Sequence, residues 1–467
     1  MMPAKLDKTL WQENTEGLCP TCLLKIPARL YRDNDQIWLE TVCPQHGINR
    51  ALLASDAEQY LRLRHFTAPR LSGSCYCGPE ENSSSCTPPV CVLLLEITNA
   101  CNLRCPTCYA DASGHDFMPI EEAKRRLDAF FLQQSKLDVL MLSGGEPTIH
   151  PRFIEILDLA LSYPIEQVLI NTNGLRIAQS DSLCEALHIR KKRIELYFSF
   201  SGFRLETHLH LYGKDLRVEK ERAMQRAMEA KIFTNLVVTL ERGMNDDEAG
   251  ELLRYAFSKD HIAGIILQPA MSSGRYEHSY QPETRLTLTD TLHLLEEQSE
   301  GILRVSDFAA LPCSHPDCCA LTYGVLRADR SGFVPLTRHL DIGRYLELFA
   351  DRISFAGLMG AALKRVWNDM THMRGRQTLS DMASLFAEAG VRDLIPLIGK
   401  PEEAGKRLFR VVVKPFMDAH TFDWQRAEQC CTKILDENGK SVSFCEYNVL
   451  HRSRKSRANL QQLRVLS

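Results

Sequence analysis

The stretch CNLRCPTC (residues 101–108) directly follows the apolar run VLLLEIT (residues 92–98), and together they decide the fold and the chemistry of the chain. The apolar run has the length and composition of a buried strand, so the cysteines lie in the loop at its carboxyl end. Thiolates at this spacing can converge on one [4Fe–4S] cluster, with Cys101, Cys105 and Cys108 as ligands. The fourth iron would then stay open for a substrate or cofactor, as the open position of a catalytic zinc does. The alternative is a distant fourth ligand that closes the site.

The same strand begins a series in which apolar runs alternate with amphipathic stretches. Strands are predicted over residues 92–98, 138–143, 166–172, 193–201, 233–240 and 263–269, with helices near 119–134, 151–162, 178–188, 218–231 and 246–257. Strands that alternate with helices form a parallel sheet with right-handed crossovers, so the fold class is α/β. A doubly wound sheet fits this alternation as well as a barrel does.

Length and composition limit the remaining possibilities. A chain of 467 residues exceeds what one core usually serves, so two or three modules are expected. The hydrophobic share of 44% and the net charge of −3 exclude a disordered chain and a globally basic nucleic-acid binder. No run approaches the roughly 18 apolar residues of a membrane span. The first residues lack an apolar export segment, which predicts a cytoplasmic protein.

Cysteine usage points to several metal sites. Of the 17 cysteines, all but Cys184 gather in five short groups. In a reducing cytosol such groups indicate metal ligands and not disulfides. Cys184 stands alone in a predicted helix and is interpreted as a small buried hydrophobe.

Two motifs resemble the signature of radical S-adenosylmethionine (SAM) enzymes. CNLRCPTCY matches their CxxxCxxC-aromatic motif, and LSGGEPTIHP, at the end of the next strand, matches their Gly-Gly-Glu motif. The resemblance implies a partial (β/α)6 barrel, which agrees with the six strand–helix units. It also implies that SAM chelates the open iron and is cleaved reductively to a 5′-deoxyadenosyl radical. An electron donor such as flavodoxin or ferredoxin would supply the electron.

The resemblance also implies which residues line the SAM pocket. Gly144 and Gly145 would let backbone carbonyls approach the SAM ammonium closely, as glycine permits, although an ordinary strand-to-loop turn explains either glycine alone. Glu146 would lie near that ammonium, and the backbone of Tyr109 would meet adenine. The remaining residues expected at the pocket are Asn173, Ser199, Ser201 and Gln268.

Nearly the whole chain, from about residue 17 to 450, resembles a narrower branch, that of tetraether synthases and class D methyltransferase-like radical SAM proteins. The resemblance rests on CPTCLLKIPARLY, VTLERGMNDDE, QPAMSSGR, PCSHPDCCALTY and CCTKILDENGKSVSFCEYN, among others. It implies a C–C bond formed at an inert carbon. The leading expectation is coupling of lipid chain ends, and the alternative is methylation of a small pterin-like molecule. The branch usually has Asp-Gly where this chain reads Ser201-Gly202, and a His where it has Lys433.

The N-terminal cysteines form a complete ligand set. Cys19, Cys22, Cys43 and His46 follow a CxxC…CxxH pattern, with a hairpin predicted around Asn34-Asp35. Four such ligands make a closed tetrahedral site, for which zinc is the chemical default. The branch resemblance suggests a mononuclear iron instead.

The other cysteines are expected to hold two auxiliary [4Fe–4S] clusters. One quartet precedes the barrel, and the other joins two distant C-terminal segments and caps the open side of the barrel. The predicted ligands are Cys75, Cys77, Cys86 and Cys91 for the first and Cys313, Cys318, Cys431 and Cys445 for the second. Cys319 and Cys430 are adjacent alternatives in the second quartet.

Four regions are therefore predicted: a metal-binding, ribbon-like module (15–70), a Cys-rich linker (71–91), the radical SAM barrel (92–284) and a largely helical C-terminal region (285–450). The helical stretch 341–364 could line a lipid tunnel, although plain core explains it as well. The basic tail after His451 could touch a membrane surface, and a frayed terminus is the simpler reading. A non-enzymatic Fe–S electron carrier is the competing function. It leaves the three-cysteine motif beside Gly-Gly-Glu unexplained.

Overall fold

The computed structural model describes residues 11–65, 90–276, 280–311, 313–339 and 407–452. The predicted tunnel stretch (341–364), three cysteines of the linker (Cys75, Cys77 and Cys86) and the basic tail from residue 453 lie outside these ranges. In the described residues, no helix has the length and apolarity needed to cross a membrane.

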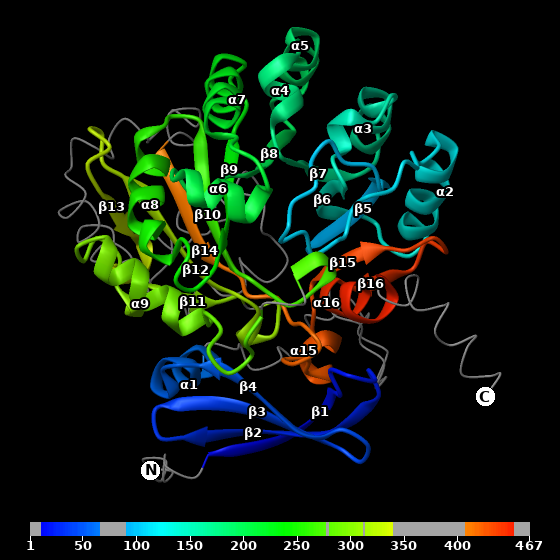
Figure 1. Cartoon of the computed structure of the whole chain (residues 1–467). Coiled ribbons are helices and arrows are strands. Elements are labelled where there is room, and N and C mark those ends of the chain that lie inside the picture. The colour runs from blue at the N-terminus through cyan, green and yellow to red at the C-terminus, as the bar shows by residue number, and fades with distance from the viewer. Residues whose placement is uncertain (1–10, 66–89, 277–279, 312, 340–406, 453–467) are drawn as a thin grey trace, which may run out of the picture.

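A four-stranded antiparallel sheet and one helix form the N-terminal module, drawn in blue in Figure 1. Its elements are β1 (Gln12–Leu18), β2 (Lys25–Asp33), β3 (Gln36–Cys43), β4 (Gly47–Ala54) and α1 (Ala57–His65). The predicted hairpin is confirmed: β2 and β3 flank Asn34-Asp35, and Asn34 takes a positive φ of 54°. Leu30, Leu39 and Ile37 are fully buried on the inner faces of these strands.

Six parallel strands follow in sequence order and confirm the predicted barrel-type sheet. They are β5 (Val92–Thr98), β6 (Leu137–Gly144), β7 (Ile165–Thr172), β8 (Ile194–Ser199), β9 (Thr234–Leu240) and β10 (Ile262–Pro269). Leu93, Leu95 and Ile97 alternate along β5 and are buried against the helices of the outer layer. Parallel strands covered on both faces explain the nearly continuous apolar runs in the sequence.

Helices cover the outer face of this sheet (Figure 1). They are α2 (Ile120–Phe131), α3 (Phe153–Leu161), α4 (Leu175–Gln179), α5 (Asp181–Arg190), α6 (Leu205–Tyr212), α7 (Arg217–Glu229), α8 (Ala249–Ser258) and α9 (Leu288–Gln298). In α2, Ala123, Leu127 and Phe130 recur at helical spacing and are buried. The outer helices thereby form the main core with the sheet.

The C-terminal region extends the sheet at both edges. Its described elements are β11 (Ala309–Ala310), β12 (Ala320–Leu326), β13 (Phe333–Pro335), β14 (Leu408–Val413), α15 (Trp424–Glu428), β15 (Thr432–Leu435), β16 (Ser441–Ser443), α16 (Phe444–Glu446) and a π-helix (Tyr447–Arg452). Strand β14 pairs in parallel with β10, and β15 pairs in parallel with β5. The described part of this region mixes strands with short helices, so the largely helical character that the sequence predicted is not found there.

Residues 414–431 connect the two edges of the barrel, and we call this segment the strap. It runs from the end of β14 to the start of β15, and the N-terminal module lies against it (Figure 1). Thr15 Oγ1 donates a hydrogen bond to Asp423 Oδ1 at 2.7 Å, and Asn49 Nδ2 donates to the His420 carbonyl at 3.5 Å. The strap therefore joins the two edge strands of the six-stranded sheet and contacts the N-terminal module.

Candidate active site and metal centres

The loop after β5 carries Cys101, Cys105 and Cys108, all half-buried. Distant segments hold it in place. Arg275 Nε donates to the Cys105 carbonyl at 2.8 Å, and the Arg275 backbone N–H donates to the Cys108 carbonyl at 3.1 Å. Thr107 Oγ1 donates to the Leu211 carbonyl at 3.1 Å. The loop backbone is thus fixed by tertiary contacts before any metal binds.

Gly274, just after β10, permits one of these contacts. It has a φ of +60°, and a Cβ atom there would lie 2.4 Å from the Cys108 carbonyl oxygen. Only glycine allows the segment before Arg275 to approach the cysteine loop this closely. The segment QPAMSSGR carries part of the family resemblance, but nothing in its sequence indicates this role of Arg275.

Gly144 and Gly145 at the end of β6 pack against the start of the same loop. A Cβ on Gly144 would stand 2.0 Å from the Thr98 carbonyl oxygen, and one on Gly145 would stand 2.1 Å from that of Ala100. The backbone N–H groups of Gly145 and Glu146 donate to those two carbonyls at 2.9 Å each. Glycine is therefore required at both positions because the chain's own backbone passes so close to them. These contacts fix how the end of β6 packs against the cysteine loop.

Glu146 is 1% exposed and collects four hydrogen bonds. Its Oε1 accepts from the Thr148 backbone and hydroxyl and from Thr172 Oγ1 at 2.8 Å, and its Oε2 accepts from the Asn173 N–H at 2.7 Å. Burial raises the pKa of Glu146, and these hydrogen bonds oppose that shift. The carboxylate joins the ends of β6 and β7 beside the cysteine loop, and no sequence pattern indicates that Thr148 and Thr172 both donate to it.

Asn173, also predicted for the pocket, reaches the cysteine loop directly. Its Nδ2 donates to Asn102 Oδ1 at 2.7 Å, and its Oδ1 accepts from the Leu175 N–H at 3.0 Å. Asn173 therefore links the ends of β5 and β7.

Burial makes the loop thiols weak acids in the absence of metal. Desolvation raises the pKa of Cys101 to about 11 and that of Cys105 to about 12. Because a metal binds the thiolate, loading must release these protons.

Lys220 on α7 places a buried positive charge near this site. Its side chain is 0% exposed, and its Nζ donates to the carbonyls of Ser199 at 2.5 Å and Asn173 at 3.3 Å. The ammonium lies 4.2 Å from the centre of the Tyr212 ring. Burial lowers the pKa of Lys220 to about 8, while the charges of Cys105 and Glu146 oppose that shift. No salt bridge to Lys220 occurs in the described chain, which suits a site that accepts an anionic cofactor.

The other predicted pocket residues have partners within the chain. Ser201 is 1% exposed, and its Oγ accepts from the Thr239 N–H at 3.1 Å, which gives this side chain a structural role. Ser199 Oγ lies 3.3 Å from the Tyr212 hydroxyl. Gln268 Nε2 donates to the Tyr197 hydroxyl at 2.7 Å. The Tyr109 ring packs against Phe444, and its carbonyl accepts from Ser273 Oγ at 3.2 Å.

The N-terminal ligand set assembles as predicted. The ligand atoms of Cys19, Cys22, Cys43 and His46 all lie within 4.8 Å of one another. His46 Nδ1 is 3.4 Å from the sulfurs of both Cys19 and Cys43, and the sulfurs of Cys22 and Cys43 are 3.9 Å apart. A hydrogen bond from the Gln45 backbone lowers the pKa of Cys43. Two turns thus present four ligands at the spacing of a single tetrahedral ion.

The structure changes the predicted grouping of the auxiliary cysteines. Cys91 lies with Cys313 and Cys431, and their sulfurs are within 4.8 Å of one another. The sulfurs of Cys91 and Cys313 are 3.0 Å apart, and those of Cys313 and Cys431 are 3.7 Å apart. The strand register explains why Cys91 belongs to this set. Strand β15 pairs with β5, which places Cys431 beside Cys91, the residue before Val92. The predicted assignment of Cys91 to a purely N-terminal quartet is corrected accordingly.

Cys318, Cys430 and Cys445 form a second, looser set, in which the charges of the members act on one another. Cys318 also packs beside Cys313 against the buried Cys91, Cys319 and Cys431, so the two sets adjoin. Cys430 and Cys445 are buried, and burial raises their pKa values to about 11 and about 12. The negative charges of Cys318 and Cys430 act on Cys445 in the same direction. Arg426 Nε donates to Cys318 Sγ at 3.3 Å. Cys430 was treated only as an alternative, because sequence spacing could not order the adjacent pair 430–431.

His315 lies between Cys313 and Cys318 in the sequence, but it forms a hydrogen bond and is not part of either cysteine set. Its Nδ1 accepts from the Asp317 N–H at 3.3 Å. Asp317 in turn binds Arg64 of α1 through both carboxylate oxygens, at 3.2 and 3.1 Å, and accepts from the Tyr60 hydroxyl at 2.6 Å. The N-terminal module therefore braces the loop that carries Cys313 and Cys318.

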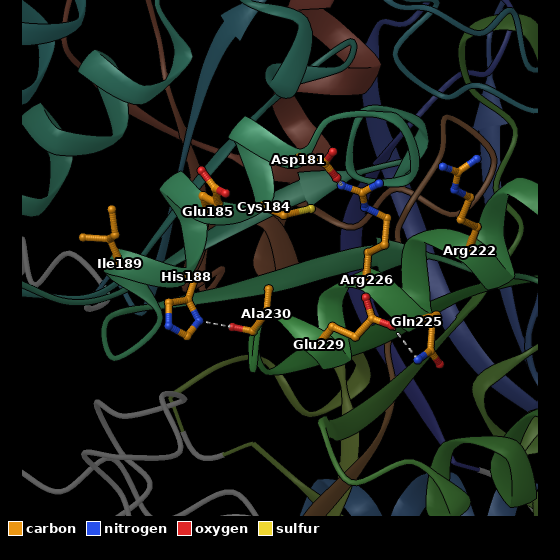
Figure 2. Close-up of a pocket in the computed structure, with 10 residues that line it drawn as sticks. All are labelled: Asp181, Cys184, Glu185, His188, Ile189, Arg222, Gln225, Arg226, Glu229 and Ala230. Atoms are coloured by element: carbon orange, nitrogen blue, oxygen red, sulfur yellow. Dashed lines mark hydrogen bonds and ion pairs between the residues drawn. The ribbon is translucent and has the colours of Figure 1, made fainter.

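A cavity of about 820 Å³ lies elsewhere, between α5 and α7 (Figure 2). Cys184 lines it together with charged residues of both helices, and its sulfur lies 3.5 Å from the Ile177 carbonyl. Figure 2 shows the His188 ring turned toward the Ala230 carbonyl, 2.7 Å away. Neither the cysteine sets nor the predicted pocket residues line this cavity. Cys184 is only partly buried, so the predicted buried hydrophobe is not found, and its sulfur lies apart from the two close cysteine sets.

Two family models match the chain. Residues 95–256 match the radical SAM superfamily, and residues 11–55 match the N-terminal zinc ribbon domain described as HMPTM. The first range covers β5 through most of α8 and includes the three-cysteine loop. The second covers the four-stranded module and all four ligands of its site.

Among curated proteins, the chain is 27% identical to a 7,8-dihydro-6-hydroxymethylpterin dimethyltransferase of Methanocaldococcus jannaschii, over 94% of each chain. It is 25% identical to a GTP 3′,8-cyclase of Streptomyces coelicolor, where the match covers 44% of this chain and 61% of that relative's length. Among solved structures, it is similar to a radical SAM methyltransferase from Sphaerobacter thermophilus, with 11% identity, a TM-score of 0.35, and coverage of 63% of this chain and 76% of that one.

Proposed function

We propose, from the premise that the chain is a radical SAM enzyme with an N-terminal zinc ribbon, that it methylates a small pterin-like molecule. One observation carries the proposal. The similarity to the pterin dimethyltransferase covers 94% of both chains and so includes the ribbon and both C-terminal cysteine segments as well as the barrel. The relative's substrate is transferred here as a proposal because sequence identity is 27%.

The lipid-coupling expectation finds no such support. The two curated relatives described above are named for a pterin and for a nucleotide substrate, and neither is named as a tetraether synthase. The stretch that could line a lipid tunnel, residues 341–364, lies outside the described residues. Pterin methylation is therefore the reading that we carry forward.

The loop after β5 fits a [4Fe–4S] cluster that binds SAM. Its half-buried thiols, the nearby ammonium of Lys220 and the fixed backbone of residues 144–146 suit an anionic cluster with one open iron. When bound, the cluster and SAM supply the radical that abstracts hydrogen. The chain's own part is to hold and orient them: Arg275 fixes the loop backbone, and Glu146 and Asn173 fix the ends of β6 and β7 around it.

We propose zinc for the ribbon site and iron–sulfur clusters for the two auxiliary sets. Cys91, Cys313 and Cys431 form one set, and Cys318, Cys430 and Cys445 form the other. Candidates for a further ligand are Cys319, which is buried in one cluster with Cys91 and Cys431, and Cys75, Cys77 and Cys86, which lie outside the described residues. An electron donor of the flavodoxin or ferredoxin type would reduce the enzyme in the cytoplasm.

The function is tested by anaerobic turnover of the reconstituted protein. The reaction contains SAM, a low-potential reductant, 7,8-dihydro-6-hydroxymethylpterin and a folate-type one-carbon donor, so that the result does not depend on the source of the methyl group. We expect 5′-deoxyadenosine together with a pterin that has gained the mass of one or two methyl groups. Formation of 5′-deoxyadenosine with an unchanged pterin would contradict the substrate assignment while leaving the radical chemistry in place.

The auxiliary assignment is tested separately with Cys445→Ala. We expect the loss of about one cluster's iron and of product formation, because Cys445 is a buried member of the second set. SAM affinity at the Cys101 loop should remain near wild type, because that loop is held by other contacts. Full iron content and full turnover in this variant would overturn the assignment.

A further inference from the structure

Arg426 is a buried cation that lies directly against a cysteine. It belongs to α15 in the strap and is 6% exposed. Its Nε donates to Cys318 Sγ at 3.3 Å, and its terminal NH2 group donates to the Pro415 carbonyl at 2.7 Å. These contacts place the Nε–H edge of the charged guanidinium against Cys318, a member of the set of Cys318, Cys430 and Cys445.

Nearby carboxylates are engaged elsewhere. Asp423, at the N-terminus of α15, accepts hydrogen bonds from Thr15 Oγ1 and from the Gln425 and Arg426 backbone N–H groups. Asp317 is bound through both oxygens by Arg64. In the described parts of the chain, no carboxylate forms a salt bridge with the Arg426 side chain. A buried guanidinium without a carboxylate partner is costly unless another anion neutralises it.

The sulfurs of the second set supply that negative charge once metal binding has deprotonated them. Burial alone would lower the pKa of Arg426, but the charges of Cys318 and Cys445 raise it well above its usual range. Loading of iron keeps these sulfurs deprotonated and places the net negative charge of a cluster at the same position.

We propose that Arg426 is the fixed counter-charge of an iron–sulfur cluster held by Cys318, Cys430 and Cys445, and that it raises the reduction potential of this cluster. The inference rests on the auxiliary clusters of the proposed function. Reduction adds one negative charge, and a positive charge in a buried, weakly screened position stabilises the reduced state more than the oxidised state. A hydrogen bond to a ligating sulfur acts in the same direction.

The other auxiliary set lies near a different buried cation, Lys414. The effect of Arg426 on the reduction potential should therefore be specific to one cluster. Lys414 begins the strap; burial alone would lower its pKa, but the nearby charges of Cys431 and Cys319 raise it overall. Its Nζ donates to Thr432 Oγ1 at 2.8 Å, so its hydrogen bond goes to a hydroxyl and not to a ligand sulfur. Substitution of Arg426 should therefore act on one auxiliary cluster and leave the other nearly unchanged.

The test is a redox titration of the full chain monitored by electron paramagnetic resonance. Cys101, Cys105 and Cys108 are first replaced together by Ala, so that the remaining signals come from auxiliary clusters. Arg426→Met, Arg426→Lys and the control Arg62→Met are compared in this background. Arg62 is a matched control because it is also held by backbone carbonyls, those of Val305 and Phe308, and lies on the ribbon helix α1.

We expect Arg426→Met to lower the reduction equilibrium constant of one auxiliary signal at least tenfold, about 59 mV for a one-electron couple. Arg426→Lys should retain most of the potential, and Arg62→Met should not change it. If the Arg426→Met variant does not retain iron, the Arg426→Gln variant takes its place. This substitution keeps an N–H donor but removes the charge, and the same tenfold decrease is expected.

Unchanged potentials in a charge-removing variant that retains its full iron would overturn this inference alone. The absence of any auxiliary cluster signal in the parent background would overturn the metal assignment of the proposed function, and this inference with it. The two failures are therefore distinguishable from the parent protein before any Arg426 variant is measured.

Discussion

The zinc ribbon and the loop after β5 both use cysteines in short turns, yet they depend on the rest of the molecule in opposite ways. In the ribbon, four ligands from two turns of one small sheet lie within 4.8 Å of one another. In the loop, three cysteines are positioned by Arg275, Leu211 and Asn173, each far away in sequence. A closed site is thus specified locally, whereas an open, reactive site requires the whole barrel to hold it in shape.

The largest effect should come from a loop cysteine. Cys105→Ala removes one of the three ligands that hold the proposed SAM-binding cluster, so 5′-deoxyadenosine formation should fall below detection. Zinc in the ribbon and most of the iron in the auxiliary sets should remain, because those ligands are separate. Metal analysis and chromatography of the reaction products measure both results.

Cys184→Ala is the matched control, because this cysteine lies apart from every ligand set. It should retain both iron and activity. If Cys105→Ala lost nearly all iron and zinc together, the sites would not be independent and the comparison would fail.

Next in size is the loss of a ribbon ligand. Cys22→Ser should release the metal of the ribbon and expose the chain before residue 70 to protease, because a sheet this small depends on its metal for much of its stability. The cysteine loop after β5 should still load iron. Limited proteolysis followed by mass spectrometry locates the first cuts. Wild-type resistance of the ribbon after zinc loss would contradict a structural role for this metal.

A smaller effect should follow from a glycine that touches no metal. Gly145→Ala places a Cβ 2.1 Å from the Ala100 carbonyl oxygen, so backbone must move at the start of the cysteine loop. Overpacking of this kind costs about 1–3 kcal/mol of folding free energy. Iron loading of the loop should fall together with the melting temperature.

Gly332→Ala provides the comparison, because its new Cβ would meet only the flexible Arg327 side chain, at 3.3 Å. Its melting temperature and iron content should stay near wild type. Equal behaviour of the two glycine variants would show that the contact between β6 and the loop is not tight.

The smallest effect concerns pH and Lys220. Its pKa falls from 10.5 to about 8 on burial, so between these values the folded state binds fewer protons than the unfolded state. Stability from this group therefore rises with pH across that window, and below about pH 8 the buried charge costs roughly 3 kcal/mol in full.

Lys220→Met should remove this pH dependence before iron is loaded. Thermal unfolding of wild type and variant at about pH 7.5 and about pH 9.5 measures the difference in stability between them. The gain in stability of the variant over wild type should be smaller at the higher pH, because the cost of burying charged Lys220 falls as the pH rises. A constant difference between the two proteins would mean that Lys220 does not titrate in this range.

These contrasts also explain how far the sequence could predict the molecule. Local spacing predicted the ribbon ligands, whose atoms the structure brings together, and the six parallel strands followed from alternating apolar runs. The same kind of spacing selected Cys101, Cys105 and Cys108, whose role as cluster ligands stays a prediction. The two glycines were identified, but their contact with Thr98 and Ala100 depends on how β6 lies beside β5.

The remainder depends on pairings that no local pattern encodes. Cys91 joins Cys313 and Cys431 only because β15 adds to the edge of the sheet beside β5. Arg275, Lys220 and Arg426 resemble ordinary basic residues in the sequence, and only their burial and partners distinguish them. Long-range contacts of this kind are set by tertiary packing and not by periodicity.

The central claim is that the loop after β5 holds a cluster whose open iron binds SAM. The most direct measurement is pulsed electron paramagnetic resonance of the reduced protein with SAM carrying magnetic isotopes in its amino and carboxylate groups. We expect hyperfine coupling from both groups in wild type and none in the Cys105→Ala variant. A reduced wild-type cluster that shows no coupling to bound SAM would contradict the claim.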